Sequence, residues 1–334
     1  MAGTKPAKVP LKHIKIVCRN MDRLVTAPLR PLGHPRGDYV PRLYRKARAQ
    51  AGAPLSYLGA RAILDHPGSH IALVTGTYNP KYFPGGETDG PIGAVVFSRV
   101  LNQLGYKTTF CVERQIIPAV QGLAKAAGAV GDYEPLEFYH PTGHEHLADK
   151  FDGAIFIEKI GVNAKGVPHT SSGMNSDTDD APVYGLAARM LEQGKFTIGL
   201  GDGGNEVGFG NIYDYVRKIV SYGAKCRCPC GDGIATVVKT SVGFPSAISN
   251  WAGYSIIAAM ALILNDLSLL HTPEKETELL ELAPSLGCYE GTIAEPVPSL
   301  DSVPVEGSAA MVQLLKSCIE VAYRDILNLA TRPY

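Results

Sequence analysis

The sequence predicts an α/β fold in three layers, in which a mostly parallel, Rossmann-like sheet is flanked by helices. Short apolar runs alternate along the chain with longer stretches of helical character. Strand and helix in regular alternation are typical of βαβ units and a parallel sheet. The residues are 45% hydrophobic and 19% charged, which is enough apolar material for a large core. We therefore expect one α/β domain over residues 40–330.

Six apolar runs are predicted as strands, and each is followed by a polar or glycine-containing stretch. In chain order they are 70–76, 108–113, 136–140, 153–161, 196–202 and 234–242. The helices predicted between and around them are 40–65, 92–105, 117–128, 144–151, 182–194, 212–223, 246–264 and 306–328. The apolar run 256–264 is too short to span a bilayer, and it indicates a buried helix.

Residues 1–39 are predicted to form a basic extension that is solvated or packs against another subunit. The first 50 residues hold 12 Lys and Arg against two acids, whereas the whole chain has zero net charge. That balance favours neither nucleic acid nor a membrane as partner. The basic segment lacks the apolar stretch of a secretory signal, and its lack of serine is not typical of a transit peptide. We expect a small-molecule ligand and possible homo-oligomers.

The cysteine content indicates a reducing compartment. Seven cysteines, an odd number spread over a long chain, do not suggest a disulfide framework. We expect a cytoplasmic location, or the mitochondrial matrix if the protein is eukaryotic. Cys226, Cys228 and Cys230 have a C-x-C-x-C spacing unlike that of zinc sites, and no second pair lies nearby, so we expect no zinc there. The histidines of residues 140–146 are expected to be ordinary loop residues.

Loops rich in Gly, Asp, Asn, Ser and Thr follow four of the predicted strands. They cover residues 76–91, 161–181, 201–211 and 240–250. In open α/β sheets, ligands bind beyond the carboxyl ends of the strands. The polar residues of these loops therefore predict a ligand site at one edge of the sheet.

The sequence GGETDGPIGA at 85–94 joins the first strand to its helix. Thr88 or Asp89 could cap that helix, and Pro91 suits its first turn. Glu87 is not explained by capping. Paired acids at a helix N-terminus coordinate a metal, orient an amine or transfer protons. Gly85 and Gly86 permit backbone angles that are closed to other residues. Gly90 is a candidate substrate-binding residue.

The stretch LGDGGNEVGFGN at 200–211 combines glycines with Asp202 and Glu206. We expect the N–H groups of Gly203 and Gly204 to face a ligand and Asn205 to orient it. Carboxylates repel phosphate unless a cation lies between them. Two hypotheses therefore stay open: a phosphate site bridged by Mg²⁺, or a site for a substrate that carries an ammonium group.

Further candidate residues lie in the remaining loops. Asp177, Asp179 and Asp180 resemble part of a cation site. Asp180 is expected to cap the next helix, while the roles of Asn175 and Asp177 stay open. Lys239, at the end of the predicted sixth strand, could hold a substrate carboxylate. Asn250 or its neighbour Ser249 is expected to cap the long buried helix, in which Trp251 is a core residue.

Several of these motifs resemble one known family. GETDGPIGA, GMNSDTDDA, GDGGNEVGFGN, VVKT and SNWAGY, in this order, are similar to the D-glutamate cyclase-like C-terminal domain family, from about residue 40 to 328. The resemblance implies a hydro-lyase activity in amino acid metabolism that converts D-glutamate to 5-oxo-D-proline and water. It implies no required cofactor, although Mg²⁺ is possible. The family's E-R-x-G pattern here reads Glu158-Lys159-Ile160-Gly161, and Lys does not replace a bidentate Arg.

Paired acids suit such a cyclisation, because it needs a base for the amine and an acid for the departing oxygen. The predicted catalytic residues are Glu87, Asp89, Asp202 and Glu206. The predicted substrate-binding residues are Thr88, Gly90, Asn175, Gly203, Gly204, Asn205, Lys239 and Asn250, with Lys159 as an alternative to Lys239.

Two other functions stay open. The first is a Mg²⁺-dependent phosphate-ester or nucleotide-binding enzyme, in which Asp89, Asp177, Asp202 and Glu206 hold the metal. The second is a domain that binds a small molecule without catalysis.

Overall fold

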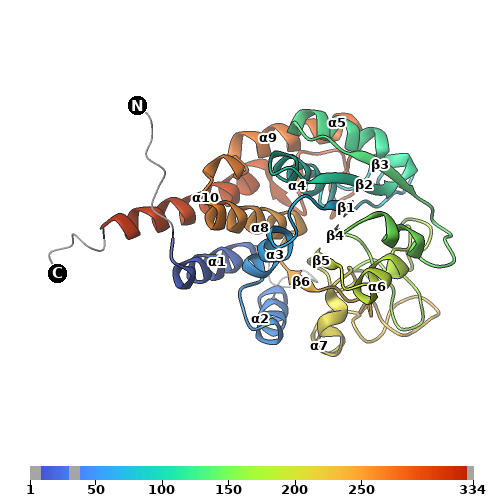
Figure 1. The fold of residues 1–334 in the computed structure, drawn as a ribbon. Coiled ribbons are helices and arrows are strands. Elements are labelled where there is room, and N and C mark those ends of the chain that lie inside the picture. Colours follow the sequence, from blue (N-terminus) through green and yellow to red (C-terminus); the bar gives the residue numbers. More distant parts are fainter. Residues whose placement is uncertain (1–8, 30–37, 329–334) are drawn as a thin grey trace.

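A six-stranded parallel sheet forms the centre of the computed structural model, which describes residues 9–29 and 38–328 (Figure 1). The strand order is β3-β2-β1-β4-β5-β6, and every neighbouring pair is parallel. The strands are β1 His70–Val74, β2 Lys107–Glu113, β3 Asp132–Leu136, β4 Gly153–Ile157, β5 Phe196–Gly201 and β6 Val242–Pro245. A small antiparallel hairpin, β7 Ser299–Leu300 and β8 Val303–Pro304, lies outside this sheet.

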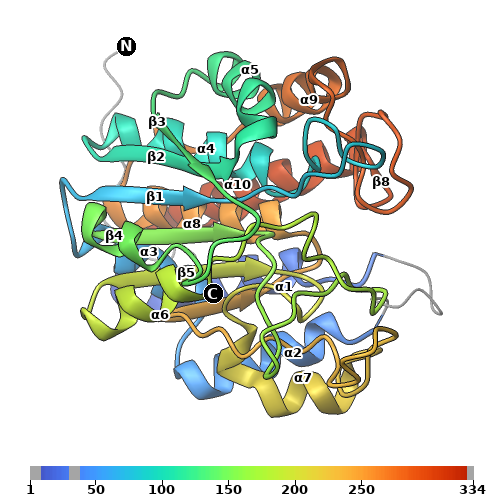
Figure 2. The same ribbon diagram turned by 90° about the vertical axis from the view of Figure 1, so that its right-hand side faces the viewer.

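Helices cover both faces of the sheet, which confirms the predicted three-layer α/β fold (Figure 2). They are α1 Leu11–Val25, α2 Val40–Ala51, α3 Leu55–Leu64, α4 Pro91–Gln103, α5 Ile117–Ala127, α6 Tyr184–Glu192, α7 Tyr213–Ile219, α8 Ser249–Leu264, α9 Pro273–Leu282 and α10 Val305–Asn328. The 3₁₀ turns are η1 Arg114–Ile116, η2 Glu145–Lys150, η3 Phe209–Ile212, η4 Leu267–Leu269 and η5 Ala283–Leu286.

Side chains alternate across the strands and so supply two cores. Ile71 and Leu73 of β1 belong to the larger core, which also contains side chains of α1 to α5 and α8 to α10. Ala72 and Val74 belong to the smaller core, which η2 and α6 complete on the other face. This alternation is the two-residue period of a strand that is buried on both sides.

Two of the predicted strands are wrong in position. The third strand is Asp132–Leu136 and not 136–140, because it pairs in register with Thr109–Glu113 of β2. The sixth begins only at Val242. Its predicted first part, 234–241, bonds to loops instead: Val237 N–H donates to Val162 O, and Val238 O accepts Gly208 N–H and Gly210 N–H.

Some predicted helices also differ in extent. The single helix expected over 40–65 is divided into α2 and α3 by Gly52, a left-handed C-cap with φ of 76°. Residues 145–150 form a 3₁₀ turn in place of an α-helix. Among the described residues, none of the helices combines the length and hydropathy needed to cross a membrane.

Helix α1 packs in the core, although we expected residues 1–39 to form a basic extension. Ile14, Cys18, Met21 and Val25 lie on one helical face and are buried in the larger core. The carboxylate of Asp22 accepts hydrogen bonds from Leu55 N–H at 2.7 Å, Ser56 N–H at 3.2 Å and the Tyr44 hydroxyl at 2.8 Å. Helix α1 is thus tied to α2 and α3, while residues 1–8 and 30–37 lie outside the described part.

Candidate active site

Acidic side chains converge where the strand order reverses, between β1 and β4. This is the switch point at which open α/β sheets bind ligands. Carboxylate oxygens of Asp89, Asp202 and Asp301 lie within 4.8 Å of one another, and so do those of Glu158, Asp202 and Glu206. All five acids are buried. We call these five residues the acid cluster.

Three loops and one hairpin supply the cluster. Asp89 follows β1, Glu158 directly follows β4, and Asp202 and Glu206 follow β5. Asp301 arrives from the two-residue turn of the β7–β8 hairpin, where it has a φ of 46° and Ser302 a φ of 69°. Two consecutive positive φ values are typical of a type I′ hairpin turn, and Asp tolerates this region better than most residues.

Glu206 is bound by its own glycine-rich loop. Its Oε1 accepts Asp202 N–H at 3.1 Å and Gly203 N–H at 2.7 Å, and its Oε2 accepts Gly204 N–H at 2.8 Å. The prediction that Gly203 and Gly204 direct N–H groups at a ligand is therefore wrong, because Glu206 occupies them. The tight fold needs Gly199, where a Cβ would lie 2.1 Å from Val207 O.

Asp89 and Asn250 cap each other's helices. Asp89 accepts Ser249 N–H and Asn250 N–H, both at 2.8 Å, at the start of α8. Asn250 Oδ1 accepts Gly90 N–H and Gly93 N–H, both at 2.9 Å, at the start of α4. The predicted local caps, Thr88 or Asp89 on α4 and Ser249 or Asn250 on α8, are therefore wrong.

Glu158 belongs to the E-R-x-G pattern of the family, but it was not predicted as a site residue. It has a φ of 49°, an uncommon conformation for a non-glycine residue, and its Oε2 accepts a hydrogen bond from the Ser249 hydroxyl. Burial, together with the charges of Asp202 and Glu206, raises the pKa of Glu158 well above its usual value. The position of Glu158 directly after an apolar strand was the one feature of the sequence that could have predicted it as a site residue. Asp301 offered no local signal.

The pKa of Asp89 is raised for the same reasons. Burial contributes most, followed by the charges of Asp301 and Asp202, while the two N–H donors of α8 oppose the shift. A site with several acids this close holds protons at neutral pH or binds a cation. Its donors are all carboxylate oxygens, which are the ligands that Mg²⁺, Ca²⁺ and Mn²⁺ prefer. The residues therefore fit a divalent cation.

Glu87 lies beside the cluster and is half-buried under a C-terminal loop. Thr88 N–H donates to Tyr289 O, and Tyr289 N–H donates to Gly86 O, both at 3.0 Å. A Cβ at Gly291 would lie 1.7 Å from Glu87 Oε1 and 2.8 Å from Asp301 Oδ1, so only glycine fits between these carboxylates. The Thr88 hydroxyl is occupied by Ser299 O at 3.0 Å, and Gly90 N–H is occupied by Asn250 and Asp89.

The structure does not bring three predicted residues into the cluster. Asn175 and Asp177 are exposed and bond each other, with Asp177 N–H donating to Asn175 Oδ1 at 2.8 Å. Lys239 is exposed and precedes β6, so it lies toward the amino end of that strand and not its carboxyl end. Its predicted place rested on the misplaced sixth strand.

Other polar residues near the site have structural partners. Lys159 is fully buried in an ion pair with Glu113, and its Nζ also bonds Gly76 O at 3.3 Å. Asp180 accepts the Thr77 hydroxyl at 2.8 Å and does not cap α6, whose N-cap is Val183. Asn205 Nδ2 donates to His169 O at 2.8 Å, while its buried Oδ1 has no partner among the described residues.

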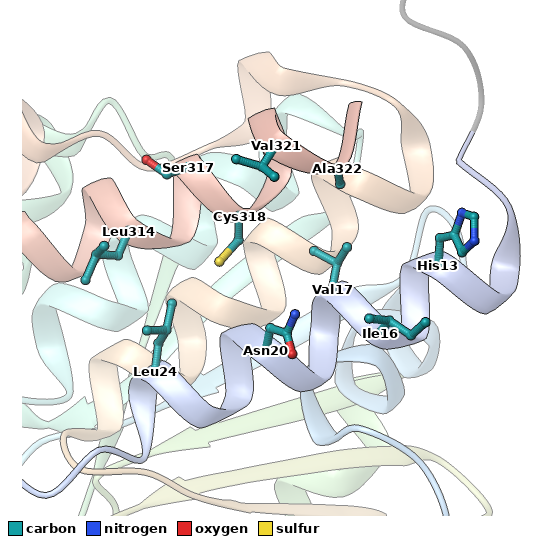
Figure 3. Close-up of a pocket in the computed structure, with 10 residues that line it drawn as sticks. All are labelled: His13, Ile16, Val17, Asn20, Leu24, Leu314, Ser317, Cys318, Val321 and Ala322. Carbon is teal, nitrogen blue, oxygen red and sulfur yellow. The ribbon is translucent and has the colours of Figure 1, made fainter. Parts of the chain in front are cut away.

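A large apolar groove lies away from the acid cluster. It has a volume of about 470 Å³ and runs between α1 and α10, where Figure 3 shows Val17 and Leu24 facing Leu314 and Cys318. None of the acids lines it. The groove is therefore not part of the candidate active site.

The fold and the acid cluster define an α/β protein with a carboxylate site at the switch point of its sheet. Residues 42–316 match the family described as D-glutamate cyclase-like, C-terminal, and the chain belongs to this family. It is also 28% identical over 225 residues to the human protein named D-glutamate cyclase, mitochondrial. The match covers 62% of this chain and 35% of the human protein, so the chain spans about a third of that relative.

Proposed function

We propose that this protein is a D-glutamate cyclase-like lyase, which converts D-glutamate to 5-oxo-D-proline and water or acts on a related small amino acid. Its distant relationship to an enzyme of that name supports a lyase-type activity. The observation that carries the proposal is the acid cluster, because five buried carboxyl groups at a ligand-binding edge can hold an ammonium group and transfer protons.

Cyclisation moves two protons from nitrogen to oxygen. The substrate's ammonium group loses two protons as its nitrogen bonds the γ-carboxyl carbon, and one carboxyl oxygen leaves as water. Glu158, with its raised pKa, would hold a proton and deliver it to the departing oxygen, while the Ser249 hydroxyl fixes its other side. Asp202 lies close both to Asp89 and Asp301 and to Glu158 and Glu206, and it would accept protons from the amine.

Substrate carboxylates need a positive partner, because the cluster would repel them. A divalent cation held by Asp89, Asp202 and Asp301 would supply this charge and bind a substrate carboxylate. Thr75, at the end of β1, offers a further donor: its buried hydroxyl has no partner among the described residues and lies against Gly90. Glu206 would act indirectly, by holding the loop that carries Asp202.

A Mg²⁺-dependent phosphate-ester enzyme is the second candidate, and the all-oxygen donor set favours it. The occupied N–H groups of residues 202–204 count against it, because they leave no phosphate cradle in that loop. A binding domain without catalysis would use the same acid cluster. Cytoplasmic or mitochondrial location and homo-oligomer formation stay predictions.

An NMR time course tests the proposal. The protein is incubated with D-glutamate or with 5-oxo-D-proline, each with and without Mg²⁺ or Mn²⁺, and with L-glutamate as a stereochemical control. We expect interconversion of D-glutamate and the ring product that is lost in Glu158→Gln and Asp202→Asn. Asp177→Asn is the matched control, since this exposed acid lies outside the cluster.

Each other outcome has a defined meaning. No interconversion with any cation would refute the cyclase proposal. Cation-dependent hydrolysis of a phosphate ester would favour the second candidate. Saturable shifts of substrate signals without product would indicate a binding domain.

A further inference from the structure

Three cysteines and one histidine converge at a second place, apart from the acid cluster. Sγ of Cys226 lies 3.5 Å from Sγ of Cys228 and 3.3 Å from Sγ of Cys230. His169 Nε2 lies 3.1 Å from Cys228 Sγ and 3.5 Å from Cys230 Sγ. All four atoms lie within 4.8 Å of one another, and the three thiols are free.

These separations are close to those of a tetrahedral zinc site. Zinc bonds sulfur at about 2.3 Å and imidazole nitrogen at about 2.0–2.1 Å, which places ligand atoms about 3.5–3.8 Å apart. The observed distances of 3.1–3.5 Å are shorter by a few tenths of an ångström. A small outward movement of the side chains would therefore admit the ion.

The histidine is oriented for metal binding. Its Nδ1 lies 3.0 Å from Val167 O, so Nδ1 carries the hydrogen and donates it. Nε2 is then left with its lone pair toward the sulfur atoms. Metal-binding histidines are characteristically fixed in this way by a carbonyl or carboxylate on the other nitrogen.

Hydrogen bonds hold the cysteine loop against the histidine loop. Asn163 Nδ2 donates to Gly233 O at 2.9 Å and contacts Cys230 Sγ at 3.4 Å. Lys165 Nζ donates to Cys230 O at 2.6 Å. Arg227 N–H donates to Gly173 O at 2.8 Å. The ligand atoms are thus brought together by two segments that are distant in sequence.

We propose that His169, Cys226, Cys228 and Cys230 bind one structural zinc ion. Thiolate and imidazole ligands select zinc over Mg²⁺ or Ca²⁺, and four protein ligands leave no open position for substrate. The C-x-C-x-C spacing alone did not predict this site, because the fourth ligand lies 59 residues before Cys228.

The zinc site would stabilise the glycine-rich loop of the acid cluster. His169 O accepts Asn205 Nδ2 at 2.8 Å, and Asn205 O accepts Gly161 N–H at 2.8 Å. Asn205 stands between Gly204 and Glu206, so the ligand histidine is one hydrogen bond away from the loop that carries Asp202 and Glu206. Loss of zinc would loosen this loop without removing any residue of the acid cluster.

Metal analysis of the full-length protein, purified under reducing conditions, tests the proposal. We expect about one zinc per chain by mass spectrometry, the stoichiometry of a closed Cys₃His site. Replacement of zinc by Co²⁺ should add thiolate-to-metal charge-transfer bands. The acid cluster offers only oxygen ligands, so Co²⁺ bound there would give no such bands.

Two variants locate the ion. Cys228→Ser and His169→Gln should lose most of the zinc, whereas Cys318→Ser, a free cysteine on α10, should keep it. If the site variants do not fold, the wild-type protein still decides the question. A thiol-specific mercurial should release its zinc in step with the modification of about three thiols.

Several results would overturn the proposal. These are a reduced protein with neither zinc nor thiolate bands after Co²⁺ addition, a native disulfide within residues 226–230, or full zinc content in Cys228→Ser. Hydrogen exchange tests the link to the acid cluster. Removal of zinc by a chelator should speed exchange of the amides of residues 202–206, and unchanged exchange would refute that link.

Discussion

Replacement of Asn250 by alanine tests whether the reciprocal caps stabilise the site. The change removes the one oxygen that accepts both Gly90 N–H and Gly93 N–H at 2.9 Å. Both amides lie in buried residues at the start of α4. Gly90 N–H keeps Asp89 Oδ1 as an acceptor at 3.1 Å, so only Gly93 N–H loses its acceptor. A buried donor left without an acceptor costs about 1–3 kcal/mol, so the free energy of unfolding should fall by about 2 kcal/mol.

Urea titration followed by far-UV circular dichroism measures this loss. We expect a lower midpoint with an unchanged slope, because the same surface is exposed on unfolding. Asn20→Ala is the matched control: Asn20 is exposed on α1, and its removal should change stability by less than about 0.5 kcal/mol. A loss below about 1 kcal/mol in Asn250→Ala would refute the assigned role, since even one orphaned donor should cost that much.

Three further predictions concern buried charges. Asp202→Asn should lower kcat/KM for cyclisation by at least about 100-fold, and activity equal to that of the wild-type protein would contradict the proposed role of Asp202. The urea midpoint without added cation should not fall, because the variant lacks one of the charges that repel each other in the acid cluster. Burial raises the pKa of Asp22 to about 6, so the folded state binds this proton more tightly than the unfolded state. The stabilisation from this proton is therefore full below about pH 4 and is lost as pH rises through about 6, by roughly 3 kcal/mol. The difference in free energy of unfolding between the wild-type protein and Asp22→Asn, measured as a function of pH, should change by this amount between about pH 4 and 6. Lys159→Met should cost about 3–5 kcal/mol by leaving Glu113 unpaired, and Glu113→Gln in the same chain should recover part of the loss in urea titrations.

The sheet and the edge that carries the site could be predicted from the sequence, because strand and helix periodicities are local properties. The polar loops after β1 and β5 did contribute Asp89, Asp202 and Glu206 to one cluster. The position of Lys239 could not be predicted, since 234–241 has the composition of a strand but bonds to loops that only the fold brings near.

The partners of the polar side chains were beyond local reasoning. Asp89 and Asn250 each lie at the start of a helix, so local rules predict that each caps its own helix. In the structure Asp89 caps α8 and Asn250 caps α4, and the two residues are 161 positions apart in the sequence. Asp301 and His169 are likewise joined to their sites by tertiary contacts alone. Glu206 lies in the acid cluster, and its hydrogen bonds to the N–H groups of its own loop could not be predicted from the sequence.

Glu206 also changes what its loop can recognise. Glycine-rich loops of this kind commonly bind an anion such as phosphate through their backbone N–H groups. Here the chain carries that anion itself, on a side chain two to four residues from the donors. The amides of residues 202–204 are therefore satisfied within the loop itself, by a side chain that is buried. Because Glu206 already accepts these N–H groups, the loop offers a phosphate none of the three amides that an empty glycine-rich loop would offer.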